Sequence, residues 1–154
     1  MKAVFGLFYI ILMFSACCST NHSQSLNNVK QGIQGYVTEI KGNQMPGPDR
    51  KPEPAKGIQT DVFIYEVTTM DEVDAVEHEP FYRSIRTKFI KSIKSGKDGF
   101  FATDLEPGTY SLFTKVDGLY YANSFNGKNQ IQAVEVLQDS IAEVNIIISA
   151  KATF

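Results

Sequence analysis

The amino-acid sequence predicts an all-β fold, an antiparallel β-sandwich of about seven or eight strands. Two observations carry this prediction. From Gly32 onward, apolar and polar residues mostly alternate, which is the pattern of a strand with one buried face. Turn residues interrupt the alternation at short intervals, and neither helical heptads nor an internal repeat is present. With 154 residues, of which 43% are hydrophobic and 12% aromatic, the chain is long enough for one domain with a buried core.

The first half of the expected domain alternates strands with long connections. Strands are expected at 33–40 and 61–67, the second with apolar residues on both faces, as in a central strand. Between them, 41–59 holds four of the six prolines and is expected to be a loop, because proline removes a ladder donor. The acidic segment 68–80 is expected to be a loop or a short helical turn, and a further strand to lie within the basic stretch 83–95.

The second half of the domain is expected to consist of short strands joined by glycine-containing turns. The strands are expected at 100–103, 109–116, 119–123, 130–137 and 141–150. The turn signals are Gly96 to Gly99, Pro107-Gly108, Asp117-Gly118 and Asn126-Gly127. Asp98-Gly99 and Asp117-Gly118 predict hairpins, and Pro107-Gly108 suits the central positions of a type II turn.

The N-terminus has the parts of a bacterial export signal. Lys2 supplies a positive charge, and 4–14 is an uncharged apolar stretch that is too short to span a bilayer. The segment Phe14-Ser15-Ala16-Cys17 resembles the lipobox of bacterial lipoproteins, with Phe14 where Leu is usual. We expect 1–16 to be a lipoprotein signal peptide and Cys17 to be acylated, which attaches the protein to a membrane. The alternatives are an ordinary signal peptide cut near Ala16 and an uncleaved anchor.

The residues that follow are expected to form a flexible tether (17–31), and the domain to occupy 32–154. The tether is polar and rich in Ser and Asn. By resemblance to lipoprotein sorting patterns, the lack of Asp directly after Cys17 argues against retention at the inner membrane. We therefore expect an outer-membrane lipid anchor with the domain facing the periplasm, the cell surface being the alternative. Cys18 has no cysteine partner across a loop, so no disulfide framework is expected.

The segment 98–112 carries a family resemblance. A turn glycine, a short aromatic strand and a Leu-x-Pro-Gly-x-Tyr motif are formed with Gly99, Leu105, Pro107, Gly108 and Tyr110. This run resembles the carboxypeptidase regulatory-like domains, which are transthyretin-like and belong to the Ig-like β-sandwiches. Matching places in the family's first two strands are held by Gly35, Val37, Pro54 and Gly57. The resemblance implies an Ig-like/transthyretin-like sandwich without catalytic activity. In such sandwiches a corner tyrosine buries its ring while its hydroxyl bonds nearby backbone, and we expect this of Tyr110.

Composition and motifs argue against several classes of function. A net charge of −2 gives no basic footprint for nucleic acid. P-loop, Rossmann, haem-binding and nucleophile-elbow motifs are missing, so no cofactor, metal site or catalytic residue is expected. Of the two histidines, His22 lies in the tether and His78 lies between two glutamates, where a solvated loop histidine is expected rather than a general base.

Two oppositely charged runs follow each other in the chain. The acidic run contains Asp71, Glu72, Asp74, Glu77 and Glu79. It is expected to be a solvated loop rather than a calcium site, because EF-hand spacing is absent. The basic run contains Arg83, Arg86, Lys88, Lys91, Lys94 and Lys97. It is expected to pair in part with the acidic run or to form a polar sheet edge. The alternative is a face that binds an anionic glycan or a lipid head group.

The candidate ligand-facing residues are Tyr120, Tyr121 and Phe125, because aromatic rings bind sugars and peptides well. The alternative is that at least two of them are core residues on opposite faces of a strand.

We therefore expect a non-enzymatic, lipid-anchored binding or accessory module of the bacterial cell envelope, with an envelope protein or a glycan as its partner. The alternative is a small transthyretin-like hydrolase whose site forms at a subunit interface, from His78 with Arg83 or Arg86. A third hypothesis is that 41–59 and 68–80 bind a protein partner by ordering on contact.

Overall fold

The computed structural model describes residues 29–45, 47, 53–77 and 80–154. The expected signal peptide and several residues singled out above lie outside this part of the chain: Cys17, Cys18, His22, His78 and Glu79. The described residues form twelve β-strands and one 3-10 turn, which confirms the all-β prediction. Within them, no helix has the length and apolar character needed to cross a membrane.

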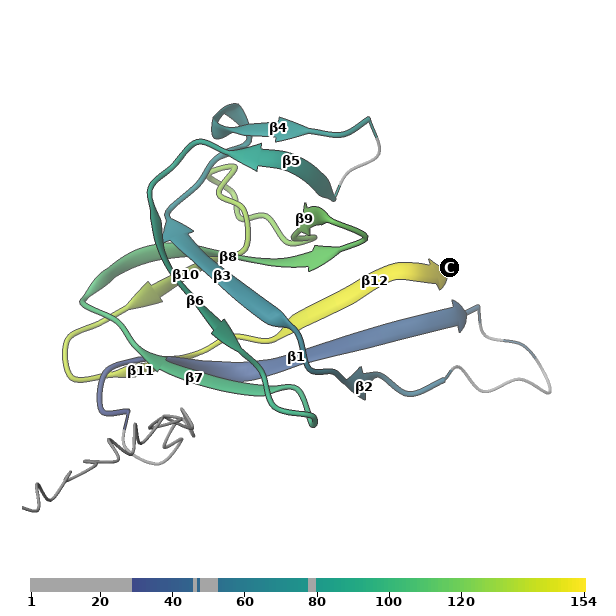
Figure 1. Cartoon of the computed structure of the whole chain (residues 1–154), viewed down its shortest axis with the longest axis horizontal. Helices are drawn as coiled ribbons and strands as arrows, with labels where there is room; N and C mark the ends of the chain where they lie inside the picture. The colour runs from purple at the N-terminus through teal and green to yellow at the C-terminus, as the bar shows by residue number, and fades with distance from the viewer. Residues whose placement is uncertain (1–28, 46, 48–52, 78–79) are drawn as a thin grey trace, which may run out of the picture.

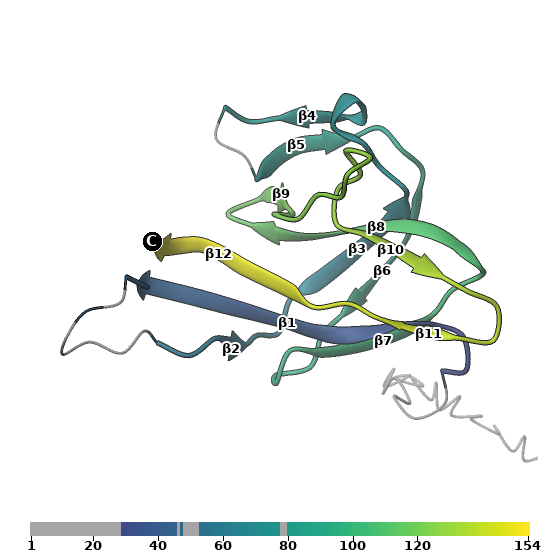
Figure 2. The same cartoon turned by 180° about the vertical axis from the view of Figure 1, so that it is seen from behind.

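The first sheet is built around the long strand β1 (Gly32–Asn43). One edge of β1 pairs antiparallel with β7 (Phe100–Asp104) and, further along, with β2 (Lys56–Gly57). The other edge pairs in parallel with β11 (Ile141–Glu143) and then with β12 (Ile146–Thr153). In Figures 1 and 2, β1 and β12 continue side by side beyond the rest of this sheet.

The second sheet contains seven strands and lies across the first (Figure 1). Its order is β4-β5-β9-β8-β3-β6, and β10 also pairs with β8. The strands span Asp61–Glu66 (β3), Val73–Ala75 (β4), Phe81–Ile85 (β5), Phe89–Lys94 (β6), Gly108–Val116 (β8), Leu119–Tyr121 (β9) and Ala133–Val136 (β10). The 3-10 turn η1 (Met70–Glu72) leads into β4. Since β3 lies between β6 and β8, it is the central strand that its two apolar faces predict.

The two sheets form a sandwich around a core of aliphatic and aromatic side chains. Val37 of β1 packs in one cluster with Val62 and Ile64 of β3 and with Leu112 of β8, and all four are fully buried. Each such side chain contributes about 1.5–3 kcal/mol relative to leaving it exposed. The contact between the sheets is therefore the main source of stability in the fold.

Each expected strand contains a strand of the structure, and the larger number of strands comes from one division and from short strands that were not expected, among them β5 at the start of the basic stretch. The expected strand 141–150 is divided into β11 and β12 at Asn145, whose side-chain Oδ1 accepts a hydrogen bond from the Tyr36 N–H at 3.1 Å. The expected loop 41–59 contains the short strand β2, and the acidic segment contains η1 and β4. β2 and β4 form by pairing with β1 and β5, the strands next to them in the chain, whereas η1 is closed locally by the hydrogen bonds of Glu72 to Thr69.

The three turn predictions have different outcomes. The hairpin at Asp117-Gly118 is confirmed between β8 and β9, with φ angles of 50° and 85°. A turn also forms before Gly99 (φ 88°), but the predicted hairpin is wrong, since β6 pairs with β3 and β7 pairs with β1. This turn carries the chain from one sheet to the other. The type II turn is wrong as well, because Gly108 has φ of 158° and begins β8, whereas that turn needs about 80°.

Gln31, the last residue of the expected tether, is bound to the domain through both polar atoms of its side-chain amide. Its Nε2 donates to the Leu105 carbonyl at 3.0 Å, and its Oε1 accepts from the Asp139 N–H at 2.9 Å. The folded domain therefore includes Gln31.

Candidate functional site

The outer face of the second sheet carries a row of aromatic side chains. Because side chains alternate along a strand, Phe63 and Tyr65 of β3 lie on the face opposite to the core between the sheets. The register places Phe63 beside Phe113 of β8 and Tyr65 beside Phe89 of β6. Three neighbouring strands thus bring aromatic rings to one face.

We define the aromatic face as Phe63, Tyr65, Phe89, Lys115 and Tyr120. Edge-to-face contacts join its rings, with centroid distances of 5.5 Å for Phe63–Tyr120 and 5.4 Å for Tyr65–Phe89. Lys115 pairs with Tyr120 across β8 and β9, and its Nζ lies 4.7 Å from the centroid of the Tyr120 ring and 5.2 Å from that of Phe63. Edge-to-face pairs are worth about 0.5–1.5 kcal/mol and exposed cation–π contacts about 0.5–1 kcal/mol. The rings are therefore held in position without a ligand.

A hydrogen bond between two hydroxyl groups fixes the centre of the aromatic face. The Tyr65 hydroxyl donates to the Tyr120 hydroxyl at 3.0 Å. Burial, and then this hydrogen bond, raise the pKa of Tyr65 well above its ordinary value. Tyr65 therefore stays a neutral donor, and the Tyr120 hydroxyl is the acceptor in this bond.

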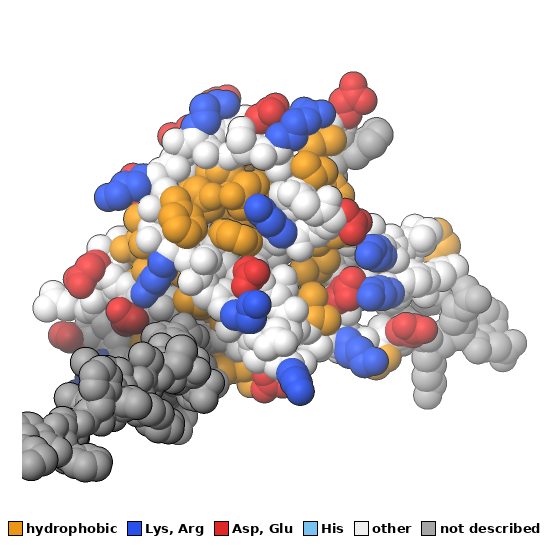
Figure 3. All heavy atoms as spheres, in the orientation of Figure 1, with side chains coloured by type: hydrophobic (Ala, Val, Ile, Leu, Met, Phe, Trp, Pro, Cys, Tyr) orange, Lys and Arg blue, Asp and Glu red, His pale blue; other side chains and the backbone are white. Residues whose placement is uncertain are grey.

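One end of the outer face is covered and the other is open. A second hydrophobic cluster, with Tyr82 of β5 and Ile131 fully buried in it, covers the end near β4 and β5. At the open end, Phe89 is 49% exposed, while Phe63 and Tyr120 are half-buried. In Figure 3, hydrophobic side chains form a continuous surface over β3 and its neighbours, with positive and negative side chains around it. This is an exposed hydrophobic patch with a charged margin.

The structure separates the three aromatic residues that the sequence singles out. Tyr120 lies on the aromatic face. Tyr121, its neighbour, is on the opposite side of β9, fully buried in the core, and its hydroxyl accepts a hydrogen bond from the Ser149 N–H at 3.0 Å. Phe125 is 42% exposed and pairs with Ile131 in an isolated bridge. Sequence reasoning missed Phe63 and Phe89, although two aromatic residues on one face of the expected strand 61–67, Phe63 and Tyr65, were a usable signal for the first of them.

The acidic run is divided among separate structural roles. The Glu72 carboxylate accepts hydrogen bonds from the N–H and the hydroxyl of Thr69, each at 2.9 Å, which closes η1. These bonds, and the nearby charge of Arg86, lower the pKa of Glu72. Asp74 forms an ion pair with Arg83 at 3.6 Å. In the part of the chain that the structure describes, no three His, Cys, Asp or Glu side chains are placed to hold a metal ion.

Part of the basic run contacts the acidic run. The Arg86 guanidinium donates to the backbone carbonyls of Asp71 and Val73, and the Arg83 guanidinium donates to that of Ala75. Both arginines of the alternative hydrolase hypothesis are thus engaged in holding η1 and β4. The prediction of partial pairing is confirmed for these two residues.

Three lysines of the basic run make a polar edge along β6. Lys88, Lys91 and Lys94 form ion pairs with Glu66, Asp104 and Asp61, at 3.7, 3.4 and 3.7 Å. β6 ends the strand order of its sheet, so the prediction of a polar edge is also confirmed. Such exposed pairs are worth about 0–1 kcal/mol each. Their main effect is to discourage another strand from adding to this edge.

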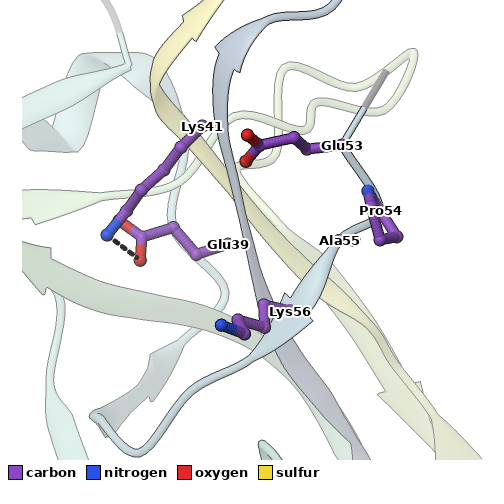
Figure 4. Close-up of a pocket in the computed structure, with 6 residues that line it drawn as sticks. All are labelled: Glu39, Lys41, Glu53, Pro54, Ala55 and Lys56. Carbon is purple, nitrogen blue, oxygen red and sulfur yellow. Dashed lines mark ion pairs between the residues drawn. The ribbon is translucent and has the colours of Figure 1, made fainter. Parts of the chain in front are cut away.

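A charged pocket of about 330 Å³ lies beside β2 (Figure 4). Its lining residues are Glu39, Lys41, Glu53, Pro54, Ala55 and Lys56. The Lys41 and Glu39 side chains form an ion pair at 2.9 Å, which is the dashed contact in Figure 4. With two carboxylates and two ammonium groups, the lining favours neither an anion nor a cation. The pocket is therefore a weaker candidate than the aromatic face.

Comparison of the chain with protein-family models, with curated proteins and with solved structures finds no match. The candidate site consequently stands on its own geometry: a preorganised, partly exposed aromatic surface with one cation above it.

Proposed function

We propose that the chain is a lipid-anchored, non-enzymatic binding module of the bacterial cell envelope that holds a protein partner against its aromatic face. The observation that carries the proposal is the group of Phe63, Phe89 and Tyr120, half-buried or exposed and fixed by contacts within the sheet. Protein interfaces are enriched in aromatic side chains, and their strongest contacts come from rigid, well-packed rings. An exposed apolar patch with a polar margin is the surface that such an interface uses.

The side chains of the aromatic face also indicate which kind of partner surface they would bind. The rings favour an apolar surface, and Lys115 favours a carboxylate opposite its ammonium group. No described carboxylate lies within ion-pair distance of Lys115, so its charge is available to a partner. The Tyr120 hydroxyl, which accepts a hydrogen bond from Tyr65, adds a hydrogen-bond donor for the partner.

The proposed location rests on the N-terminal sequence. The apolar stretch and the lipobox-like segment ending at Cys17 support lipidation, and the polar residues that follow support a tether long enough to let the domain reach a partner. The resemblance of 98–112 to the carboxypeptidase regulatory-like domains, which are not catalytic, supports a binding role. We place the anchor in the outer membrane with the domain on its periplasmic side.

The proposal is tested with a photo-crosslinking amino acid in the full-length lipoprotein in a bacterial host. Benzoylphenylalanine at position 89 is expected to form one discrete adduct with an envelope protein on irradiation. The matched control places the same residue at position 137, where Leu137 is 60% exposed but lies outside the aromatic face. The substitution K115E is expected to abolish the adduct at position 89, because it reverses the charge that the partner meets.

The outcomes separate the proposal from its competitors. An adduct that forms equally from position 137, or that persists with K115E, would show contact unrelated to the aromatic face. Adducts with lipid alone, identified by mass spectrometry, would show that the face lies on the membrane instead. Either result overturns the proposal.

A further inference from the structure

A second, uncharged pocket lies on the other side of β9 from the aromatic face. It has a volume of about 400 Å³, which lies in the lower part of the range for small-molecule sites. β12 forms one wall, and the segments that follow β9 and precede β10 form the other. A hydrogen bond between the hydroxyls of Tyr121 and Ser149, and another from the Asn123 amide to the Ser149 hydroxyl, join the two walls.

The polar lining of this pocket consists of amides and hydroxyls. Its members are Asn123, Ser124, Gln132, Asn145 and Ser149. Each of these side chains both donates and accepts hydrogen bonds. The hydroxyl groups of a sugar do the same, and therefore match this lining better than a phosphate or an ammonium group does. No charged side chain is among the described lining residues, so an anionic ligand finds no counter-charge.

Apolar side chains complete the pocket. Ile40 of β1, Ile147 of β12 and Phe154 also line it, and the last two are 44% and 71% exposed. A pyranose ring has an apolar C–H face as well as its hydroxyl edge, and exposed aliphatic and aromatic side chains cover such a face. Side-chain alternation along β1 puts Ile40 on the other side of the strand from Glu39 and Lys41, which line the charged pocket.

Gln132 is the residue that distinguishes this pocket from an ordinary polar groove. It is only 8% exposed, and its side-chain Oε1 is buried without a hydrogen-bond partner among the described residues. Its Nε2 makes only a long contact, 3.5 Å, to the Asn145 carbonyl. A buried carbonyl oxygen without a donor costs free energy, and a ligand hydroxyl would supply that donor.

The backbone conformation of Gln132 is also unfavourable in free energy. Its φ is 40°, in the left-handed region that residues other than glycine seldom adopt. Its N–H donates to the Ser124 carbonyl at 2.8 Å, and its carbonyl accepts from the Leu112 N–H at 3.2 Å. An irregularity next to a strand commonly redirects a side chain at a binding site. Here it lies directly before β10, at a residue that lines the pocket.

From this lining and from Gln132, we infer that the pocket binds a neutral carbohydrate, with the Gln132 side-chain oxygen accepting a hydrogen bond from a sugar hydroxyl. The Asn123 and Asn145 amides contact neighbouring hydroxyls, and Ile147 and Phe154 cover the apolar side of the ring. The site is separate from the aromatic face and does not depend on the function proposed for that face.

The experiment follows the side-chain amide signals of the full-length protein by NMR during titration with sugars. The protein is kept in a detergent without a sugar head group, because a maltoside would compete for the pocket. The probes are glucose, galactose, mannose and N-acetylglucosamine at millimolar concentration, with cyclohexanol as a ring of similar size that has one hydroxyl. At least one sugar is expected to shift the Asn123, Gln132 and Asn145 signals, and cyclohexanol to leave them in place.

Variants distinguish the pocket from other surfaces. Q132L removes the unpartnered oxygen, and N123A removes an exposed amide that makes a long hydrogen bond, 3.4 Å, to the Ser149 hydroxyl. Each is expected to weaken sugar binding about tenfold, which corresponds to about 1.4 kcal/mol. Q138A, at an exposed position outside the pocket, is expected to leave binding unchanged. If Q132L fails to fold, N123A carries the test.

Two results overturn the inference. One is the absence of shifts at these three amides with all four sugars. The other is binding that N123A and Q132L leave at the wild-type level, which would place the sugar elsewhere on the molecule.

Discussion

Glycine at residue 35 decides how closely two strands approach each other. A Cβ built on Gly35 would lie 1.7 Å from the backbone carbonyl oxygen of Val144, at the junction between β11 and β12. The contact is with backbone, so no side-chain movement can relieve it. The same holds at Gly57, where a Cβ would lie 1.8 Å from the carbonyl oxygen of Asp98. Two glycines that carried the family resemblance thus have a physical role in closing the first sheet.

Substituting Gly35 tests this role. We expect G35A to lower the free energy of unfolding by about 3 kcal/mol, because β1 must separate from the β11–β12 junction. The measurement is urea denaturation of the full-length protein. G127A is the matched control, since a Cβ at Gly127 meets no atom within 4 Å, and its effect should stay within about 0.5 kcal/mol. Equal stability of the two variants would contradict the proposed role.

Tyr110 behaves as the sequence predicts for a corner tyrosine. Its ring is half-buried, and its hydroxyl donates to the Glu106 carbonyl at 2.9 Å. Burial, and then the charges of Glu106 and Glu66, raise the pKa of Tyr110. The hydroxyl therefore ties the segment before β8 to the strand while remaining neutral.

Removing that hydroxyl gives a second measurable effect. Y110F is expected to cost about 1 kcal/mol, the typical net value of one hydrogen bond, in the same urea denaturation experiment. Y36F is the control, because the Tyr36 ring is 47% exposed and its hydroxyl has no partner among the described residues. A loss in Y36F as large as in Y110F would argue that ring packing, and not the hydroxyl, is responsible.

At the scale of elements, the acidic segment is an ordered part of the second sheet. η1 is closed by Glu72 on Thr69, β4 pairs with β5, and Arg86 ties the segment to the chain after β5. β4 and β5 then cover one end of the outer face and leave the other end open. The charges of this segment consequently shape the aromatic face, because they hold its cover in position.

The lowered pKa of Glu72 makes this element sensitive to acid. Its pKa is lower in the folded than in the unfolded chain. Its contribution is therefore complete above the unfolded value of about 4.3 and is lost as pH falls through the folded value. E72Q removes this contribution, so the free energy of unfolding should fall less steeply on acidification than in the wild-type protein. Urea denaturation at a series of pH values measures the difference.

Thr69 supplies the control for this prediction. T69V removes the hydroxyl donor but keeps the N–H that also binds the Glu72 carboxylate. It should change the pH dependence in the same direction as E72Q, and by less. An E72Q variant that keeps the wild-type slope would show that the carboxylate does not link folding to pH.

At the scale of the whole molecule, the two candidate surfaces lie on opposite sides of one short strand. Tyr120 of β9 belongs to the aromatic face. Tyr121, on the other side of β9, is buried in the core, and its hydroxyl binds Ser149, which lines the uncharged pocket. A protein partner and a small carbohydrate could therefore be held at the same time. The proposed lipid on Cys17 would keep both surfaces near the membrane.

Cys17 and its neighbour provide a direct test of the anchor. C17S is expected to abolish acylation of the N-terminus, because the thiol that carries the lipid is lost. C18S changes the adjacent cysteine and should leave acylation intact. Mass spectrometry of the N-terminal peptide, with cell fractionation, measures both. An unmodified N-terminus in the wild-type protein would contradict lipidation at Cys17.

Much of the strand pattern could be predicted, because the alternation of apolar and polar residues is a local property. β1, β3, β7 and β8 lie where the alternation places them, and the Asp117-Gly118 turn joins the strands on either side. Pairing could not be predicted in the same way. The glycine turn at 96–99 has the chemistry of a hairpin, yet it joins strands of different sheets, because each of them finds a better partner elsewhere.

The candidate surfaces depend on tertiary structure to a greater degree. The residue types were visible in the sequence: aromatic residues in 61–67 and 120–125, and amides and hydroxyls after them. Only the folded sheet brings Phe63, Phe89 and Tyr120 together, since they come from three strands that are distant along the chain. Only the folded chain buries the Gln132 oxygen, which has no hydrogen-bond partner among the described residues. Local sequence therefore specifies which segments form strands, whereas long-range packing decides which side chains share a surface.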